Sequence, residues 1–171
     1  SYQFDSNSNV YLSISNGYKS GGVNQNPRLS EDNRLYKPEF NENFDFGYKY
    51  KGQDSYLSLN VFYMLRNDLQ VNLSSQQDSS NPNSFYFYTS NASDGYNCGM
   101  TLNFKHIYLD SFESYLNIGY LKTKINSYSY LEGENNLVTF DSREAAHAPA
   151  YTISYGFNKY YKNVSFGADL I

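Results

Sequence analysis

The feature that most constrains this chain is a two-residue alternation of apolar and polar side chains that continues over unusually long segments. In residues 56–74, Leu57 and Leu59 alternate with Ser58 and Asn60, and the pattern runs on to the end of the segment. Successive side chains of a β-strand point to opposite faces of a sheet, so a period of two predicts a strand with one apolar and one polar face. Strands of globular proteins are usually about 5–6 residues long, so strands of this length point to a less common kind of sheet.

The same alternation divides the chain into seven segments, and none of them has the 3.6-residue apolar repeat that is typical of a helix. We therefore predict an all-β fold, an antiparallel meander of about seven long, tilted strands with no helix longer than a turn. The predicted strands cover residues 9–22, 37–51, 56–74, 85–107, 112–126, 147–160 and 164–171.

Each strand is expected to place its two kinds of side chain on opposite sides, and a register slip of one residue would invert every one of them. We expect Phe44, Phe46, Leu57, Leu59, Val61, Met100 and Leu102 on a convex, lipid-facing side, and Asp45, Ser58, Asn60, Thr101 and Asn103 on the concave side.

The connections between the predicted strands alternate in length. The tight ones cover residues 52–55, 108–111 and 161–163, and the long, polar ones cover residues 23–36, 75–84 and 127–146. Because every second connection of a meander lies at the same end, we expect the three long ones to share one end of the sheet. Tight turns at one end and long loops at the other are typical of transmembrane β-barrels in the bacterial outer membrane.

The composition fits a sheet with one wet and one apolar face. The 171 residues include 20 Tyr and 12 Phe, and aromatic residues favour a pleated, half-buried surface or a membrane interface. The 13 Lys and Arg are scattered and the net charge is −4, so the sequence carries no basic footprint for nucleic acid. We predict no nucleic-acid partner.

Two consecutive segments carry a resemblance to a known family. The stretch "VYLSISNGYKSGGVN" ends a strand in an aromatic, glycine-rich motif, and "YKPEFNENFDFGYK" opens the next with Pro-Glu and closes it with Gly-x-Lys. In this order, followed by "FYMLRNDLQ", the segments resemble the mid-to-late barrel of TonB-dependent outer-membrane receptors. Met100 departs from the pattern, since the family usually has Glu there. The matching residues are Gly17, Tyr18, Lys19, Gly21, Gly22, Asn24, Pro38, Glu39, Gly47 and Lys49.

The resemblance implies a barrel of 22 strands around a plug, of which residues 1–171 would be a fragment without the plug or the end of the barrel. It implies a location in the outer membrane of a Gram-negative bacterium and active uptake of a scarce nutrient, typically a ferric siderophore. The implied partners are outer-membrane lipid, the plug and remaining strands, the nutrient, and TonB through segments outside this chain.

Four polar residues near the outer end of the predicted strands are candidates for lining the lumen. Glu39, Arg66, Asp68 and Gln70 are expected to face inward, either near a ligand or in a network that holds the plug and neighbouring strands. We find no catalytic constellation and predict no enzyme activity. No metal site and no cofactor are predicted, because the two histidines lack neighbours at metal-ligand spacing.

Two other functions stay open from the residues alone. A soluble β-sandwich that binds carbohydrate through exposed Tyr and Asn would need short strands and two packed sheets. A passive porin would be expected to bring a constriction loop with acidic and basic residues.

The number of predicted strands also bears on the shape of the sheet. Single-chain bacterial barrels have an even number of strands, and seven is odd. We therefore expect an open sheet, with residues 9–22 and 164–171 as unpaired edges.

Overall fold

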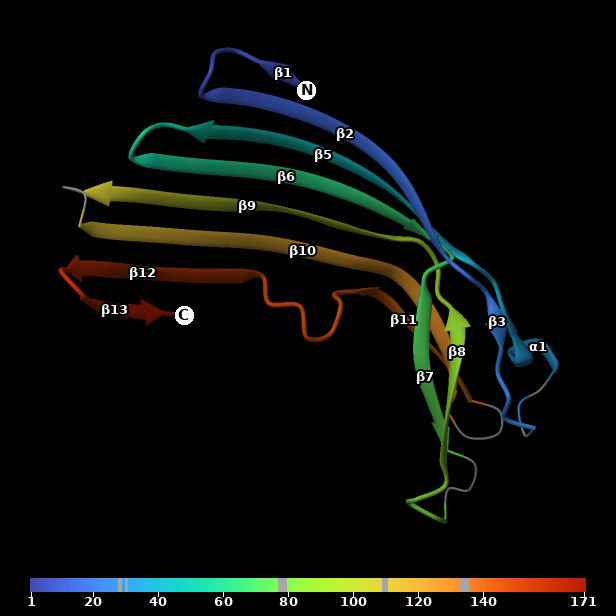
Figure 1. Ribbon diagram of the computed structural model, residues 1–171. Coiled ribbons are helices and arrows are strands. Elements are labelled where there is room, and N and C mark those ends of the chain that lie inside the picture. The colour runs from blue at the N-terminus through green and yellow to red at the C-terminus, as the bar shows by residue number, and fades with distance from the viewer. Residues whose placement is uncertain (28, 30, 77–79, 109–110, 133–135) are drawn as a thin grey trace.

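The computed structural model describes residues 1–27, 29, 31–76, 80–108, 111–132 and 136–171. One curved antiparallel sheet dominates the molecule (Figure 1), and its strands lie in the order β1-β2-β5-β6-β9-β10-β12-β13. This is the open meander predicted from the alternation. Its strands are β1 (Tyr2–Gln3), β2 (Ser8–Lys19), β5 (Glu39–Lys51), β6 (Ser55–Asn67), β9 (Gly95–Tyr108), β10 (Phe112–Glu132), β12 (Tyr151–Tyr161) and β13 (Val164–Leu170).

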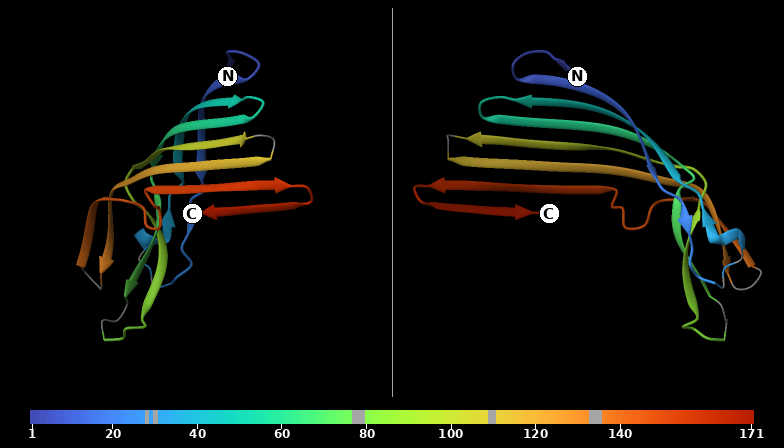
Figure 2. Two further views of the ribbon diagram at one scale, coloured as in Figure 1. Left: turned by 90° about the vertical axis from the view of Figure 1, so that its left-hand side faces the viewer. Right: turned by 45° about the vertical axis from the view of Figure 1, so that its right-hand side comes forward.

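Three excursions leave this sheet at the same end, where Figures 1 and 2 show them bending away from it. The first contains β3 (Gly22–Val23), the single-turn helix α1 (Glu31–Arg34) and β4 (Leu35–Tyr36). The second is the hairpin of β7 (Gln70–Gln76) and β8 (Phe85–Asn91), and the third pairs the far half of β10 with β11 (Asn136–Arg143). The predicted clustering of the long connections at one end is therefore confirmed, although residues 28, 30, 77–79 and 133–135 of these connections lie outside the described residues.

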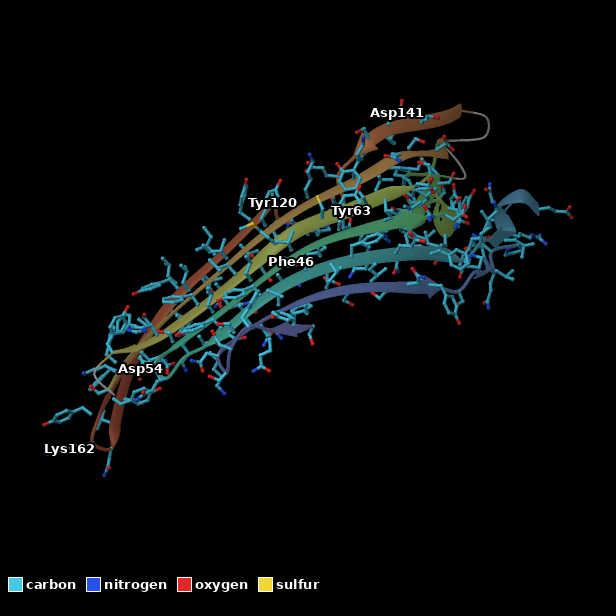
Figure 3. The ribbon with its side chains drawn as sticks, turned by 90° about the horizontal axis from the view of Figure 1, so that it is seen from above. Phe46, Asp54, Tyr63, Tyr120, Asp141 and Lys162 are labelled. Carbon is cyan, nitrogen blue, oxygen red and sulfur yellow. The ribbon has the colours of Figure 1, made fainter. Side chains whose placement is uncertain are left out.

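The tight turns lie at the opposite end. Figure 3 places Asp54 and Lys162 there, whereas Asp141 of the third excursion lies at the far end of the sheet. Of the predicted tight turn at residues 108–111, residues 109–110 lie outside the described part. None of the helices in the described residues is long and apolar enough to cross a membrane.

Two of the predicted strands are in fact broken. Residues 56–74 divide into β6 and β7 at Asp68, whose φ of 51° turns the chain out of the sheet. Residues 85–107 divide into β8 and β9, because β8 pairs with β7 in a separate two-stranded sheet. The apolar-polar alternation continues through the first break and gave no sign of it, whereas at the second break it stops over residues 91–95, and the prediction passed over this interruption. Asp is one of the few residues that adopts a positive φ readily.

The predicted loop at residues 127–146 is also wrong, because most of it is a hairpin. Strand β10 continues to Glu132 and pairs with β11, from Glu132↔Asn136 to Ile125↔Arg143. Between Ile125↔Arg143 and Ser127↔Asp141 the pairing omits Asn126 and Ser142, and Ser142 has a φ of 55°, so the hairpin is locally irregular but its register does not shift. This segment is rich in Tyr, Leu, Val and Thr, which favour strands, and its polar residues had pointed to a loop.

One of the two edges of the main sheet, the one at the first predicted strand, is not unpaired as predicted. The first predicted strand ends at Lys19, and its beginning is covered by β1 through the pairs Tyr2↔Val10 and Gln3↔Asn9. The prediction of an unpaired first edge is therefore wrong for these residues. At the other side, β13 pairs only with β12 among the described strands, as predicted for the last strand.

The strand register confirms that the two predicted sets of side chains lie on opposite faces. Phe46 is paired with Val61, which is paired with Met100, so these three share one face. Asn60 is paired with Thr101 on the other face. We call the first the apolar face and the second the polar face. That the apolar face is the convex one stays a prediction.

The polar face is crowded at the points where a glycine lies opposite a large side chain. At Gly47 an added Cβ would overlap the ring of Tyr11, and at Gly156 it would overlap Tyr115. Tyr11 accepts a hydrogen bond from Asn60 Nδ2 at 2.9 Å. Every glycine in the main-sheet strands lies on this face: Gly17, Gly47, Gly95, Gly99, Gly119, Gly156 and Gly167.

The apolar face, in contrast, is open. Leu12, Phe46 and Ile153 are 69%, 46% and 58% exposed. The described sheet forms a single layer with no second sheet packed on it, which is not the architecture of a soluble β-sandwich. The buried apolar side chains lie instead at the end of the long connections: Leu29, Leu69, Tyr88 and Ala92.

Candidate functional site

Glu39 is the centre of a polar cluster at the end of the sheet from which the excursions leave. It is the first residue of β5, lies on the polar face and is 5% exposed. Its Oε1 accepts hydrogen bonds from Arg66 Nε at 2.8 Å and Arg66 Nη2 at 2.5 Å. Its Oε2 accepts the backbone N–H of Gln70 at 2.9 Å. Both oxygens of this buried carboxylate are therefore engaged by donors from β6 and β7.

The Gln70 side chain extends the cluster to the first excursion. Its Nε2 donates to the backbone oxygens of Ser20, at 2.9 Å, and Lys37, at 3.0 Å. Ser20 follows β2 and Lys37 precedes β5, so one amide holds together the two points where the chain leaves and re-enters the main sheet. Gln70 itself is 9% exposed.

Asn91, the last residue of β8, binds the same backbone from the other side. Its Oδ1 accepts the N–H of Lys37 at 2.7 Å, and its Nδ2 donates to the oxygens of Lys37 at 3.1 Å and Asp68 at 2.7 Å. The amide thus pairs with Lys37 as a neighbouring strand would. It fixes the base of the β7–β8 hairpin against the start of β5.

Asn24 makes the corresponding link farther out. Its Nδ2 donates to the backbone oxygens of Asn33 at 2.8 Å and Thr89 at 2.7 Å, and its Oδ1 accepts the N–H of Thr89 at 2.9 Å. One side chain therefore joins the first excursion to β8. We call Asn24, Glu39, Arg66, Gln70 and Asn91 the loop junction.

The glycine pair at positions 21 and 22 permits this arrangement. A Cβ on Gly21 would lie 2.5 Å from the backbone oxygen of Tyr36 and 2.9 Å from Pro38 N, and one on Gly22 would lie 2.7 Å from Tyr36 Cζ. At Gly21 the close atoms belong to the backbone, so only glycine allows the two ends of the first excursion to approach so closely there. The motif "GGVN" is thus explained by backbone packing and by the amide of Asn24.

The remaining motif residues act within the sheet. Tyr18 is 72% exposed and lies beside Phe40, with ring centroids 6.4 Å apart. Lys49 extends over the ring of Tyr11, with its Nζ 5.4 Å from the centroid, and that ring in turn covers Gly47. These residues shape the two faces of β2 and β5.

Of the four residues predicted to line the lumen, three have side chains that lie together, and the fourth, Asp68, joins them only through its backbone. Glu39, Arg66 and Gln70 are joined directly. Asp68 takes part through its backbone: its N–H donates to Asp94 Oδ1 at 3.4 Å, and its oxygen accepts Asn91 Nδ2. Asp68 does not share a strand with Gln70, so the prediction that they lie on one face of a continuous strand is wrong.

The sequence analysis did not single out two further contacts that hold the third excursion. Ser93 Oγ donates a hydrogen bond to the backbone oxygen of Ser127 at 2.8 Å and accepts one from the backbone N–H of Ser127 at 2.7 Å. Thr123 Oγ1 accepts the N–H of Ala145 at 2.8 Å and is 7% exposed. Serine and threonine are common throughout this chain, so no sequence signal marked these two sites.

A pocket of about 260 Å³ lies between the second and third excursions. The Arg143 guanidinium lies over the Phe140 ring, with Cζ 3.5 Å from the centroid. The pocket therefore combines a cation, a carboxylate, a phenol and aliphatic carbon. It is lined by Val71, Asn72, Leu73, Ile125, Tyr128, Arg143, Glu144 and Ala146.

The described residues contain no group of three or more His, Cys, Asp or Glu side chains placed to hold a metal ion. His106 lies far from the loop junction, at the tight-turn end, where its Nδ1 is 2.7 Å from Ser55 Oγ.

Comparison with known proteins gives a family match over nearly the whole chain. Residues 1–169 match the model described as "TonB dependent receptor-like, beta-barrel". A search of curated protein sequences gave no match. Among solved structures, the ferric yersiniabactin uptake receptor FyuA from Yersinia pestis is 20% identical with a TM-score of 0.68, over 92% of this chain. The copper transporter OprC is 15% identical with a TM-score of 0.73, over 98% of this chain.

These identities are low, so the two structures establish similarity of fold. The chain spans only 21% of the length of the first structure and 24% of the second.

Proposed function

The chain belongs to the TonB-dependent receptor β-barrel family, and from this premise we propose that it is one segment of a barrel that imports a scarce nutrient, a ferric siderophore. Members of the family lie in the outer membrane of Gram-negative bacteria and are transporters rather than enzymes. Residues 1–171 contribute eight strands of an open meander and the three excursions at one of its ends. The remaining strands and a plug complete the receptor.

The observation that carries this proposal is the common position of the three excursions. They leave the sheet at one end, and the loop junction joins the first two of them through side-chain hydrogen bonds. Loops on a rigid scaffold are the usual place for binding residues. The excursions offer far more chain for a binding site than the turns of a few residues described at the other end. The nutrient is therefore captured at the end with the excursions.

The ligand class is supported by the chemistry of that end and by the relatives. One similar structure is described as a ferric yersiniabactin uptake receptor and the other as a copper transporter. The pocket between the second and third excursions offers Arg143 and Tyr128, which suit an anionic, aromatic chelator better than a bare cation. A ferric siderophore has this character.

Glu39, Arg66, Asp68 and Gln70 act in this proposal as lumen-side residues that hold the loops in place. Since both oxygens of Glu39 are already engaged, the cluster supports the ligand site from below. Import further requires the plug and energy delivered through TonB, both by segments outside this chain.

Uptake of radiolabelled iron tests the proposal. Cells that produce the full receptor are grown under iron limitation and given ferric siderophores of the catecholate, phenolate and hydroxamate classes. We expect receptor-dependent uptake of at least one class, abolished by a protonophore that collapses the inner-membrane gradient. Cells without the receptor gene are the control.

Two results would contradict the proposal in different ways. Receptor-dependent uptake of copper without any siderophore would remove the ligand class but keep active transport. Uptake that is insensitive to the protonophore would indicate a passive channel and remove the energy coupling as well.

A further inference from the structure

Two lysines lie on the apolar face of β10, toward the end of the main sheet from which the excursions leave. Lys122 is paired with Cys98 of β9, and Lys124 with Tyr96, which places both on the face that carries Tyr120. Lys122 is exposed and Lys124 is half-buried. Within the described residues the ion pairs are Arg66–Glu39 and Lys105–Glu113, so neither lysine has a protein counter-ion there.

An open apolar hollow of about 500 Å³ adjoins these lysines on the same face. Cys98 lies directly between Tyr63 and Lys122 in the strand register, and its small side chain leaves space among larger ones. Figure 3 shows Phe46, Tyr63 and Tyr120 near the middle of the sheet. The hollow is lined by Leu12, Phe44, Phe46, Val61, Phe62, Tyr63, Cys98, Gly99, Met100 and Tyr120.

The aromatic residues around the hollow indicate its depth in a membrane. Tyr63 stacks on Tyr96 with centroids 5.6 Å apart, and Tyr120 lies 5.1 Å from Tyr151. Tyrosine collects where the hydrocarbon meets the headgroups. Lys122 is two residues beyond Tyr120, about 7 Å along the strand toward the excursions, and a long lysine side chain can extend its ammonium farther toward the headgroup layer.

We propose that this part of the apolar face is a binding site for one anionic membrane lipid. The lipid phosphate lies between Lys122 and Lys124, and one acyl chain fills the hollow beside Cys98. A cation near the bilayer surface attracts an anionic headgroup, and the ten side chains and backbone segments of the hollow offer hydrocarbon contact over the neighbouring surface. A free anion would use the lysines alone and leave the hollow without a function.

The arrangement favours a lipid over a protein partner for a geometric reason. The charged and apolar parts follow one another along the strand direction, and in a spanning strand this is the direction of the membrane normal. A lipid has the same order, with its headgroup outward and its chain inward. The surrounding face is apolar and exposed, as expected for contact with the bilayer.

Native mass spectrometry of the complete receptor tests the site. The purified protein, freed of lipid in a non-ionic detergent, is titrated with long-chain phosphatidylglycerol. We expect one adduct to saturate first. Replacing both lysines, Lys122→Gln with Lys124→Gln, should weaken this adduct by roughly 30-fold. Cys98→Phe should weaken it as well, because the ring fills the hollow while the lysines stay.

The matched control is Lys159→Gln. Lys159 lies on the same face, paired with Phe112 and Phe166, but at the tight-turn end, where it donates a hydrogen bond to Ser111 Oγ at 2.7 Å. This variant should bind phosphatidylglycerol as the unchanged protein does. A variant with arginine at positions 122 and 124 keeps both charges and should also retain the adduct.

Three results would overturn the proposal. The first is that the double glutamine variant binds phosphatidylglycerol as tightly as the unchanged protein, while heat-dependent gel migration shows that the variant is folded. If the double glutamine variant does not fold, loss of the adduct in the folded arginine variant counts equally against the site. The second is equal binding of phosphatidylcholine with the same chains. The third is equally tight binding of short-chain phosphatidylglycerol or inorganic phosphate, which would mark a site for free anions.

Discussion

The main sheet and the loop junction are stabilised in opposite ways. In the main sheet, regular backbone pairing joins the strands, and large side chains such as Leu12 stay exposed on one face. In the loop junction, side chains such as Glu39 are buried and bind backbone groups of other segments. The sheet therefore depends on its surroundings to cover the apolar face, whereas the loop junction depends on particular residues that substitute for missing strand pairing.

The comparison also separates two kinds of motif residue. Gly47 lies in the sheet and makes room for Tyr11, whereas Gly21 and Asn24 act where the first excursion begins. All of them are explained by packing within this chain, without a ligand. The residues that match the family pattern thus shape the main sheet and the start of the first excursion.

Trimming the β10–β11 hairpin should have the largest effect on function. Removal of residues 129–141, closed by a short turn, leaves Ser127 and its contacts with Ser93 in place. It deletes Phe140, on which the guanidinium of Arg143 lies, and so removes the support of one of the side chains that line the pocket. We expect ligand affinity to fall at least about 100-fold, measured by titration of the purified receptor, because several contacts are lost together.

Insertion of this trimmed receptor into the membrane should be unaffected, since the strands below the hairpin are intact. Unchanged affinity would place the ligand site elsewhere. As a contrast, deletion of two residues from the tight turn at 52–55 should reduce the amount of folded receptor.

Glu39→Ala should cost the most stability. It leaves the Arg66 guanidinium without its partner and the Gln70 N–H without an acceptor. We expect a loss of about 3 kcal/mol, because removal of one partner from a mostly buried pair leaves the other uncompensated. Denaturant titration of the full receptor measures it. Glu39→Gln keeps an acceptor for the N–H of Gln70, so a loss as large as that of alanine would argue against this contact.

Gly47→Val should disturb the main sheet instead. The new side chain would occupy the position of the Tyr11 ring, and overpacking of this kind costs about 1–3 kcal/mol. Unfolding of the double variant with Tyr11→Ala checks the cause, because shortening the ring should recover most of the loss. Additive losses would show that the two residues do not compete for the same space.

Asn24→Ala should have the smallest effect, confined to the loop end. Three hydrogen bonds to backbone groups are lost, and we expect about 1–2 kcal/mol of local stability to go with them. Hydrogen exchange at the Thr89 amide should accelerate, while the amides of β6 and β9 stay protected. Faster exchange throughout the main sheet would contradict the separation of the two regions.

The sequence predicted the main sheet well because its physical cause repeats at every second residue. The strands β5 and β6 begin and end within two residues of the prediction, apart from the far end of β6 at Asp68. Only part of the loop junction could be predicted from the sequence. Glu39, Arg66 and Gln70 were singled out as polar residues near strand ends, but their bonds join segments far apart in the chain, which no local pattern encodes. The hairpin at β11 was missed because its polar residues resemble those of a loop.

The central claim is that the apolar face of this sheet contacts lipid while the polar face contacts water. Spin labels placed singly at residues 57–61 of the full receptor in bilayers, with Cys98→Ser to remove the native thiol, test it directly. Collision rates with oxygen, which concentrates in the bilayer, should be high at Leu57, Leu59 and Val61 and low at Ser58 and Asn60. A water-soluble nickel chelate should give the reverse. Uniform accessibility along the segment, or alternation in the opposite phase, would contradict the account.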